Sequence, residues 1–404
     1  MDIFSTVKVL QIATKVPFPL EDGSKIGIFN LTEQFVKHGA EVTFAAPYLG
    51  DKMSNRFTAM VDFVPLPINT RYTISGGIRN LFSILPYNME KYWNEAAFEI
   101  LSDLCKTNSF DVIHIDHLHM ASYGLGLRKK YGAQVVLREH NFESEIMGRL
   151  SDNTKNPLLK VYTRLQHSRV LKLESSTLQN VDAVLPISEA DERKLTGLVP
   201  GIRSFVVPAG IDPGRFVPCS TFVNDRVLFL TSYDWLPNID SYNFYVREIV
   251  PILRLRAPQM KTIIAGKKTD SIPSNLLSDS IEVRGFARDF NEFSSMASIA
   301  VIPLRIGSGV RIKLLELMAL GMAVVSTSIG AEGIEVEDGK HLLLADRAED
   351  FADQIVRLAS SPTLCMKLGE NAREFVAQRY TWDLAGEKLM GAYRTILEGY
   401  ADRN

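Results

Sequence analysis

Short apolar runs alternate with longer amphipathic segments along most of this 404-residue chain. The first apolar run is Val7 to Ala13, an amphipathic pattern covers residues 25–38, and a second run follows at 41–46. Continuous apolar runs are typical of strands buried in a parallel sheet, and the longer segments that connect such strands are usually helical. The pattern predicts a Rossmann-like domain, although G-x-G-x-x-G is missing from its first turn.

The same alternation begins again near Arg226, after a stretch rich in glycine and proline at Ser204 to Phe216. A chain of this length usually exceeds one hydrophobic core. We therefore expect an α/β protein with two Rossmann-like domains and a boundary near residue 205. The strands predicted for the second domain are at 227–231, 261–265, 281–283, 299–302, 323–326 and 341–344.

The most informative stretch runs from Pro303 to Val325, PLRIGSGVRIKLLELMALGMAVV. It predicts a strand end, a glycine turn, an amphipathic helix and another strand. Glycines allow backbone N–H groups to approach a ligand, and a helix start favours an anion. We expect Arg311 and Lys313 in the first helical turn, where cations are disfavoured unless an anion binds nearby, and Glu316 one turn later. These residues suggest a diphosphate site with a carboxylate placed for sugar hydroxyls. A solvated helix face is the alternative.

Two further strands end in polar residues. In DVIHIDHLH, a strand continued to its end would place His114 and Asp116 on one side and His117 and His119 on the other. A metal site is the less favoured interpretation, because parallel strands seldom present four ligands to one point. The second strand ends in REHN, at the sheet edge where doubly wound folds bind ligands. Its candidate site residues are Arg138, Glu139, His140 and Asn141.

Charge and composition narrow the class of protein. A formal net charge of −2 argues against a nucleic-acid binder that depends on phosphate contacts. The cysteines at 105, 219 and 365 are scattered, as in reduced proteins. Because signal-peptide and transmembrane patterns are missing, we expect a cytoplasmic protein. A basic amphipathic helix at 156–174 predicts either a solvated face over a buried stripe or peripheral contact with a membrane.

The chain resembles the retaining glycosyltransferases of family 4, which have the GT-B fold of two Rossmann-like domains facing across a cleft. Glu316 in LLELMALGMAVV stands where the family has a glutamate that contacts the donor ribose. Ser308 stands where many members have a second glutamate, and GSGVRIK resembles a branch with G-G-G-T-R-x-K. The segments EHNFES and DWLPN resemble the branch that builds bacterial cell-surface polysaccharides.

The resemblance implies transfer of a sugar from a nucleotide diphosphate sugar to the hydroxyl of a glycan or lipid-linked glycan. Because the sequence has no D-x-D-like pair for a metal, we expect an enzyme that works without metal or cofactor. Arg311 and Lys313 would bind the diphosphate, because TSYDWLPN lacks the family's Arg/Lys pair. A histidine beside the donor sugar would be His119 or His117, and we favour His119. The other donor-side residues implied are Gly23, Gly307, Ser308, Gly309, Gly285, Glu332 and, more weakly, Lys267.

In the resembled fold the last helix crosses back to the first domain, so we expect an N-terminal acceptor domain at 1–205 plus 383–404 and a donor domain at 206–382. Arg138, His140 and Asn141 would then lie on the acceptor side. Two rival functions remain open at this point. One is a sugar phosphorylase, and the other is a nucleotide-sugar-binding or scaffold protein whose catalytic site has decayed.

Overall fold

The computed structural model describes residues 7–20, 22–48, 50, 54–218, 221–286 and 291–401. The chain forms two compact units, Met1–Pro208 with Trp382–Asn404 and Ala209–Thr381. Cys105 and Cys365 are free thiols, and Cys219 lies outside the described residues.

The first unit is built on a six-stranded sheet of order β3-β2-β1-β4-β5-β6, in which every neighbouring pair is parallel. Its strands are β1 (Lys8–Ile12), β2 (Glu41–Pro47), β3 (Asp62–Leu66), β4 (Val112–Asp116), β5 (Gln134–Glu139) and β6 (Ala183–Pro186). Its helices are α1 (Gly23–Lys37), α2 (Asn55–Thr58), α3 (Ile74–Asn80), α4 (Tyr87–Glu90), α5 (Glu95–Thr107), α6 (Ala121–Tyr131), α7 (Glu143–Asn153), α8 (Pro157–Asn180), α9 (Glu189–Leu198) and α16 (Trp382–Ala401).

The second unit repeats this design with a parallel sheet of order β12-β11-β10-β7-β8-β9. Its strands are β7 (Arg226–Leu230), β8 (Lys261–Ala265), β9 (Ile281–Gly285), β10 (Ile299–Ile302), β11 (Ala323–Ser326) and β12 (Leu343–Leu344). Its helices are α10 (Leu236–Phe244), α11 (Val250–Arg256), α12 (Asn291–Ser294), α13 (Ile312–Ala319), α14 (Ala348–Ser360) and α15 (Pro362–Arg379). Successive residues of β10 enter two different cores, Ile299 and Val301 one, Ala300 and Ile302 the other. Burial on both faces explains the continuous apolar runs of the sequence.

Both sheets have the doubly wound strand order, so the prediction of two Rossmann-like domains is confirmed. In such a sheet the order reverses between the two central strands, which here are β1 and β4 in the first unit and β7 and β10 in the second. Ligands bind at the carboxyl ends of the strands at this point, because the loops there diverge to opposite faces. The segments that follow these four strands are therefore where a site is expected.

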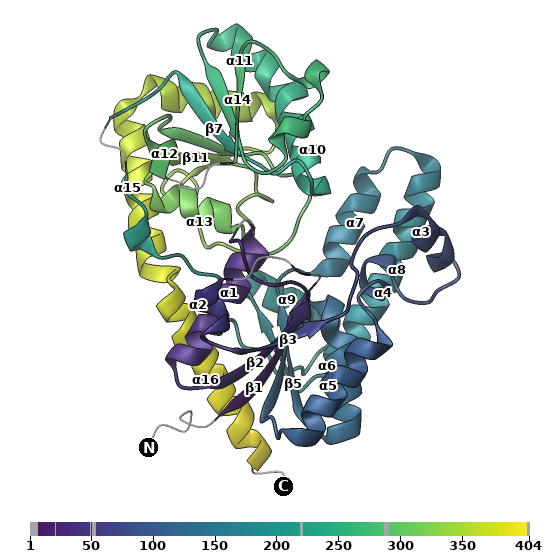
Figure 1. The fold of residues 1–404 in the computed structure, drawn as a ribbon. Coiled ribbons are helices and arrows are strands. Elements are labelled where there is room, and N and C mark those ends of the chain that lie inside the picture. The colour runs from purple at the N-terminus through teal and green to yellow at the C-terminus, as the bar shows by residue number, and fades with distance from the viewer. Residues whose placement is uncertain are drawn as a thin grey trace. The chain divides into compact units, whose positions relative to one another are not determined.

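The last helix, α16, belongs to the first unit and packs against α1 (Figure 1). Asp383 accepts a hydrogen bond from Lys37 at 2.6 Å. Farther along α16, the hydroxyl of Tyr393 is hydrogen-bonded to Nδ1 of His114, a buried residue of β4, at 2.6 Å. The end of the chain thus supports the centre of the first sheet.

Two local predictions are wrong, and one strand was not predicted. The unpredicted strand is β3, which has Pro65 inside it. A proline is tolerated there because β3 is an edge strand. The strand β4 ends at Asp116, so the alternation does not extend to His117 and His119. The helix α13 begins at Ile312 and Arg311 is its N-cap residue, not part of its first turn.

Candidate functional site

The turn after β10 depends on its glycines. Gly307 has φ 148° and Gly309 has φ 76°, conformations that other residues rarely adopt. A Cβ atom on Gly307 would lie 2.6 Å from Nη2 of Arg311. A side chain at 307 would be strained, and the turn brings the buried residues 307–309 to the start of α13.

Arg311 is buried and holds this turn in place. Its Nη1 donates to the carbonyl oxygens of Ser308 and Gly309, and its Nη2 donates to the carbonyl oxygen of Ile329 at 3.4 Å. Ser308 is buried with it. The guanidinium therefore places a positive charge directly beneath the glycine turn, and it links the turn after β10 to the turn after β11.

Lys313 connects the segments that follow β7 and β10, the two central strands between which the strand order of the second sheet reverses. This place is called the second switch point, and its equivalent between β1 and β4 is the first. The Nζ of Lys313 donates to the carbonyl oxygen of Leu230, at the end of β7, and to Oδ1 of Asn238, both at 3.3 Å. Burial, reinforced by the nearby charge of Arg311, lowers the pKa of Lys313 to about 8. A bound anion would reverse this effect by stabilising the ammonium.

Glu316 lies one turn farther along α13 and is only 8% exposed. Burial raises the pKa of its carboxyl to about 7, against the opposing influence of Arg215 and Lys313. A buried carboxyl of this kind is poised to accept hydrogen bonds from a ligand that enters the site. The sequence did not single out Arg215, because about a hundred residues separate it from Glu316.

The other donor-side candidates of the second unit lie at the carboxyl ends of neighbouring strands. Gly285 ends β9 with φ 73°. Lys267 follows β8, is half-buried, and its carbonyl oxygen accepts from the backbone of Tyr233 at 2.9 Å. Glu332 is partly buried in the turn after β11. The sheet brings all three to the edge at which Arg311 and Lys313 lie.

In the first unit, a buried network is centred on Asp116 at the end of β4. Its carboxylate accepts hydrogen bonds from Gln11 at 2.6 Å and from Nε2 of His140 at 3.0 Å, and Nε2 of His114 lies 3.5 Å away. Burial alone would raise the pKa of Asp116, but His114 and His140 more than offset it and hold that pKa well below its usual range. Asp116 therefore stays ionised and fixes the ring of His140.

His117 is the first residue beyond β4 and is backed by this network. Its ring stacks on His140 with centroids 3.8 Å apart and an angle of 3°, and its Nε2 is hydrogen-bonded to Oγ of Ser24 at 3.0 Å. Among the described residues, its buried Nδ1 has no hydrogen-bond partner. Burial, with a contribution from His140, holds the pKa of His117 well below its usual range, so the ring is neutral. Ser24 lies at the start of α1, after β1, and His117 follows β4. The hydrogen bond between them therefore joins the segments after the two central strands of the first sheet.

His119 lies in a different environment. It belongs to a short 3₁₀ turn, Leu118–Met120, and its ring packs edge-on against Tyr92 with centroids 5.2 Å apart. Burial lowers its pKa to about 3. It lines a cavity of about 270 Å³ together with mostly apolar side chains, Leu85, Met89, Trp93, Leu118, Ser122, Tyr123 and Leu173.

The remaining candidates lie around the end of β5. Arg138 is fully inside the unit, where its Nη1 donates to the carbonyl oxygen of Val207 at 2.7 Å and burial lowers its pKa to about 10. The side chain of Asn141 donates to Glu143 at 3.3 Å. Arg138 is thus hydrogen-bonded to a backbone carbonyl, whereas His140 and Asn141 are hydrogen-bonded to the carboxyl groups of Asp116 and Glu143.

Glu139 was predicted as a site residue, but the buried carboxyls beside it, Glu143 and Glu174, were not. Glu174 of α8 accepts from the backbone N–H groups of Glu143, at 2.8 Å, and Ser144, and so caps the start of α7. Burial raises the pKa of Glu174 to about 8. Burial and the neighbouring Glu174 also hold the pKa of Glu139 well above its usual range. The signal was hidden because a glutamate within a helical pattern usually faces water.

The backbone of His117 leads to a stability prediction. Its φ of 72° with ψ of 144° is a conformation that costs a non-glycine residue about 1–3 kcal/mol. Both His117→Ala and His117→Gly remove the ring, but only glycine relieves the strain. We expect the glycine variant to be more stable than the alanine variant by about 1 kcal/mol, the reverse of the usual order. Urea unfolding of the two proteins measures this, and an alanine variant of equal or greater stability would contradict it.

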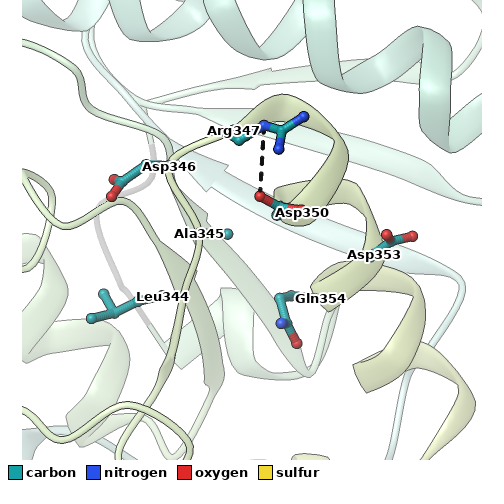
Figure 2. Close-up of a pocket in the computed structure, with 7 residues that line it drawn as sticks. All are labelled: Leu344, Ala345, Asp346, Arg347, Asp350, Asp353 and Gln354. Atoms are coloured by element: carbon teal, nitrogen blue, oxygen red, sulfur yellow. Dashed lines mark ion pairs between the residues drawn. The ribbon is translucent and has the colours of Figure 1, made fainter.

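A separate hollow of about 500 Å³ lies at the end of β12 and the start of α14. Figure 2 shows Arg347 paired with Asp350, at 4.0 Å, with Asp346 and Asp353 nearby. Three carboxylates against one guanidinium do not suit a diphosphate. The hollow contains none of the predicted site residues.

Within the described ranges, no group of three or more His, Cys, Asp or Glu side chains could hold a metal ion. The helices of the described part of the chain also include none that is long and apolar enough to span a membrane.

Solved structures with the same fold place the chain in a class. Sucrose-phosphate synthase from Thermosynechococcus elongatus superposes with a TM-score of 0.76 at 17% identity, over 97% of this chain and 100% of the other. TarM superposes with a TM-score of 0.71 at 12% identity, over 96% and 98%. HepE of Anabaena, solved in complex with UDP, gives 0.67 at 12% identity, over 96% and 100%. The likeness shows the GT-B fold, in which two doubly wound domains follow each other in one chain.

Sequence comparison gives the family. Residues 22–215 match the model described as Glycosyltransferase Family 4, and residues 224–361 match the model described as Glycosyl transferases group 1. The chain is a glycosyltransferase that combines these two family domains. It is 21% identical to an uncharacterized 44.6 kDa protein in the cps region of Klebsiella pneumoniae, over 92% of this chain and 96% of the relative. It is 23% identical to the putative glycosyltransferase EpsD of Bacillus subtilis, over 78% and 87%.

Proposed function

We propose that this glycosyltransferase acts with retention of configuration and moves a sugar from a nucleotide diphosphate sugar to the hydroxyl of a glycan or lipid-linked glycan. Uracil is the first base to test. The observation that carries the proposal is that the buried Arg311 bonds to the glycine turn, while Lys313 and Glu316, which interact electrostatically, follow it on α13 at the second switch point. Two cations and a carboxyl with a raised pKa match two adjacent parts of such a donor, the diphosphate and the ribose.

On the donor side, the leaving group is a diphosphate whose charge grows as its bond to the sugar breaks. Lys313 and the backbone N–H groups of residues 307–309 would stabilise that charge, and the start of α13 would add its partial positive charge. Arg311 would keep the turn in its binding shape through its bonds to Ser308 and Gly309. Glu316 would accept hydrogen bonds from the ribose hydroxyls. Lys267, Gly285 and Glu332, on the same sheet edge, are proposed to contact the rest of the donor.

On the other side of the reaction, we assign the contact with the donor sugar to His117. Its buried Nδ1 has no hydrogen-bond partner among the described residues, and its Nε2 is hydrogen-bonded to Ser24 beside Gly23, the residue proposed to adjoin the donor phosphates. Asp116 and His140 would hold its ring in place. His119 would act on the acceptor side, in its apolar cavity, and Arg138, His140 and Asn141 are the other candidates proposed for that side. The acceptor hydroxyl replaces the diphosphate oxygen at the sugar carbon, and its proton leaves with the diphosphate.

The relatives support the choice of substrates. HepE of Anabaena was solved with UDP-glucose, and the pneumococcal O-GlcNAc transferase GtfA with UDP and GlcNAc. The relatives from the cps region and EpsD agree with the resemblance to enzymes of cell-surface polysaccharide synthesis. We therefore propose that pathway class for this protein, with an acceptor at or near the inner face of the membrane.

The test is a thermal-shift screen of UDP, GDP, ADP, dTDP and their sugars against wild type and Glu316→Gln. A ligand that binds the native state raises its melting temperature by mass action. We expect one base to give a clear shift that is lost in the variant. A matched control is Glu349→Gln, which changes an exposed glutamate of α14 in the same unit. No shift with any nucleotide would contradict the proposal, and so would loss of transfer in EDTA that Mn²⁺ restores, because the proposed site uses no metal.

Binding of the donor should have a maximum near neutral pH. Lys313 must be protonated to attract the diphosphate, and its pKa is about 8; Glu316 must be ionised to accept strongly, and its pKa is about 7. We expect affinity for the nucleotide sugar to fall about tenfold per pH unit above 8, and to fall below 7. Titration calorimetry across pH measures this. Lys313→Met should remove the alkaline limb and Glu316→Gln the acid limb, whereas a flat profile in wild type would contradict the assignment.

A further inference from the structure

Two segments of the first unit expose large apolar side chains close to each other. In the segment from α3 to α4, Phe82 is 91% exposed and Ile84 is 88% exposed. In α8, Leu158 is 83% exposed and Val161 is 68% exposed. Side chains of this size are costly to leave in water, and neighbouring ones usually mark a surface that binds something.

The apolar positions of α8 form a stripe on its outer side. Leu158, Val161 and Leu165 recur at i, i+3 and i+7, so they lie on one face of the helix. The buried positions Thr163 and Val170 lie on the other side of the helix at 100° per residue. The apolar stripe therefore faces away from the side of α8 that packs on its own unit.

Hydrogen bonds fix the α3–α4 segment beside that stripe. Arg169 of α8 donates to the carbonyl oxygens of Asn80, at 2.8 Å, and Leu81, at 3.0 Å. Gln166 donates to the side chain of Asn80 at 2.9 Å and accepts from the backbone of Tyr87, also at 2.9 Å. Figure 1 accordingly shows α3 and α4 beside the α7–α8 pair. The exposed apolar face is defined here as Ile78, Phe82, Ile84, Leu158, Val161 and Leu165.

Positive charge predominates along the two segments that carry this face, although Glu90 at the end of α4 accepts a hydrogen bond from Asn80. Residues 67–89 and 154–173 contain seven lysines and arginines and no aspartate or glutamate, although the whole chain has a formal net charge of −2. The cations are Arg71, Arg79, Lys155, Lys160, Arg164, Arg169 and Lys172. A second copy of the chain docked through the same face would bring these cations together, which is unfavourable.

We propose that the exposed apolar face docks this protein on the surface of a bilayer that contains anionic lipid. The apolar side chains would enter the boundary between headgroups and acyl chains, and the surrounding lysines and arginines would contact lipid phosphates. This geometry suits a peripheral contact, since the apolar groups lie on one helix face and one adjoining turn. The inference rests on the surface of the first unit and does not depend on the proposed donor site.

The test is flotation of the full chain with vesicles of phosphatidylcholine alone and with an equal part of phosphatidylglycerol. We expect binding to the anionic vesicles only, weakened by added salt. The double variant Phe82→Ser/Ile84→Ser should bind at least about tenfold more weakly. Arg79→Ala and Arg164→Ala should each weaken binding about fivefold. Circular dichroism and thermal unfolding report that each variant is folded, and neither should change.

The matched controls are Leu255→Ser and Arg254→Ala on α11, because Leu255 is 84% exposed and Arg254 is exposed beside it. Both should bind vesicles like wild type. The proposal is overturned if wild type ignores anionic vesicles, or if Phe82→Ser/Ile84→Ser binds them as well as wild type does. Light scattering that shows a wild-type dimer, lost in that same variant, would also overturn it, since the face would then be an interface between copies.

Discussion

Lys313→Met is expected to lower kcat for sugar transfer by about 10²–10³-fold. Lys313 is the cation that spans both arms of the second switch point, through Leu230 and Asn238. Removing one preorganised group that stabilises charge in a transition state typically costs that much. Methionine keeps the length and apolar stem of lysine, so the variant should fold. Steady-state kinetics with a saturating acceptor measure the effect.

The matched control for this variant is Lys261→Met. Lys261 is exposed at the first position of β8, which is the opposite edge of the same sheet from the proposed site. It should leave kcat within about twofold of wild type. If Lys313→Met retained most of the wild-type kcat while Lys261→Met did the same, Lys313 would have no part in stabilising the leaving group.

His117→Ala is expected to lower kcat by about 10²-fold, and His119→Ala to act mainly on KM for the acceptor. The reason is the difference in surroundings. His117 is stacked on His140 and bonded to Ser24 at the first switch point, so its ring has a fixed direction. His119 lines an apolar cavity. A hydrogen bond to the donor sugar that strengthens in the transition state appears in kcat, whereas uniform binding of the acceptor appears in KM.

Asp116→Asn provides an independent check on this assignment. It preserves the shape of the side chain but removes the charge that fixes His140. If His140 positions His117, the variant should lower kcat in the same direction as His117→Ala, and the double variant should be no worse than His117→Ala alone. Additive losses would show that Asp116 and His140 act by a route other than His117. The opposite ranking of His117→Ala and His119→Ala would return the sugar contact to His119.

The sequence was sufficient to predict the two Rossmann-like sheets. Burial on both faces makes each central strand a continuous apolar run, and β10 and β11 are examples of it. The edge strand β3 was missed because it lies partly exposed and contains Pro65. The two-residue strand β12 is shorter than the predicted one for a similar reason, since pairing at an edge continues only as far as its single neighbour allows.

The candidate site could be predicted in part. The glycine turn, Lys313 and Glu316 are neighbours in sequence, so one local pattern contains them. The network around Asp116 could not be predicted in this way, because its contacts come from β1, β5 and α16, with Tyr393 lying 279 positions from His114. The direction of His117 also depends on a positive φ that no periodic pattern encodes. The part of the exposed apolar face on α8 could be predicted, as a basic amphipathic helix. The part between α3 and α4 could not, because it is held beside α8 by hydrogen bonds to Arg169 and Gln166 that no local pattern encodes.

The most direct test of the central claim is titration calorimetry of UDP, UMP and uridine into wild type and Lys313→Met. If a diphosphate is bound at the second switch point, wild type should bind UDP at least about tenfold more tightly than UMP, and UMP more tightly than uridine. The variant should lose most of the difference between UDP and UMP and keep its weaker affinity for uridine. Equal affinities for UDP and uridine in wild type, or a preference for UDP that Lys313→Met leaves unchanged, would contradict the account.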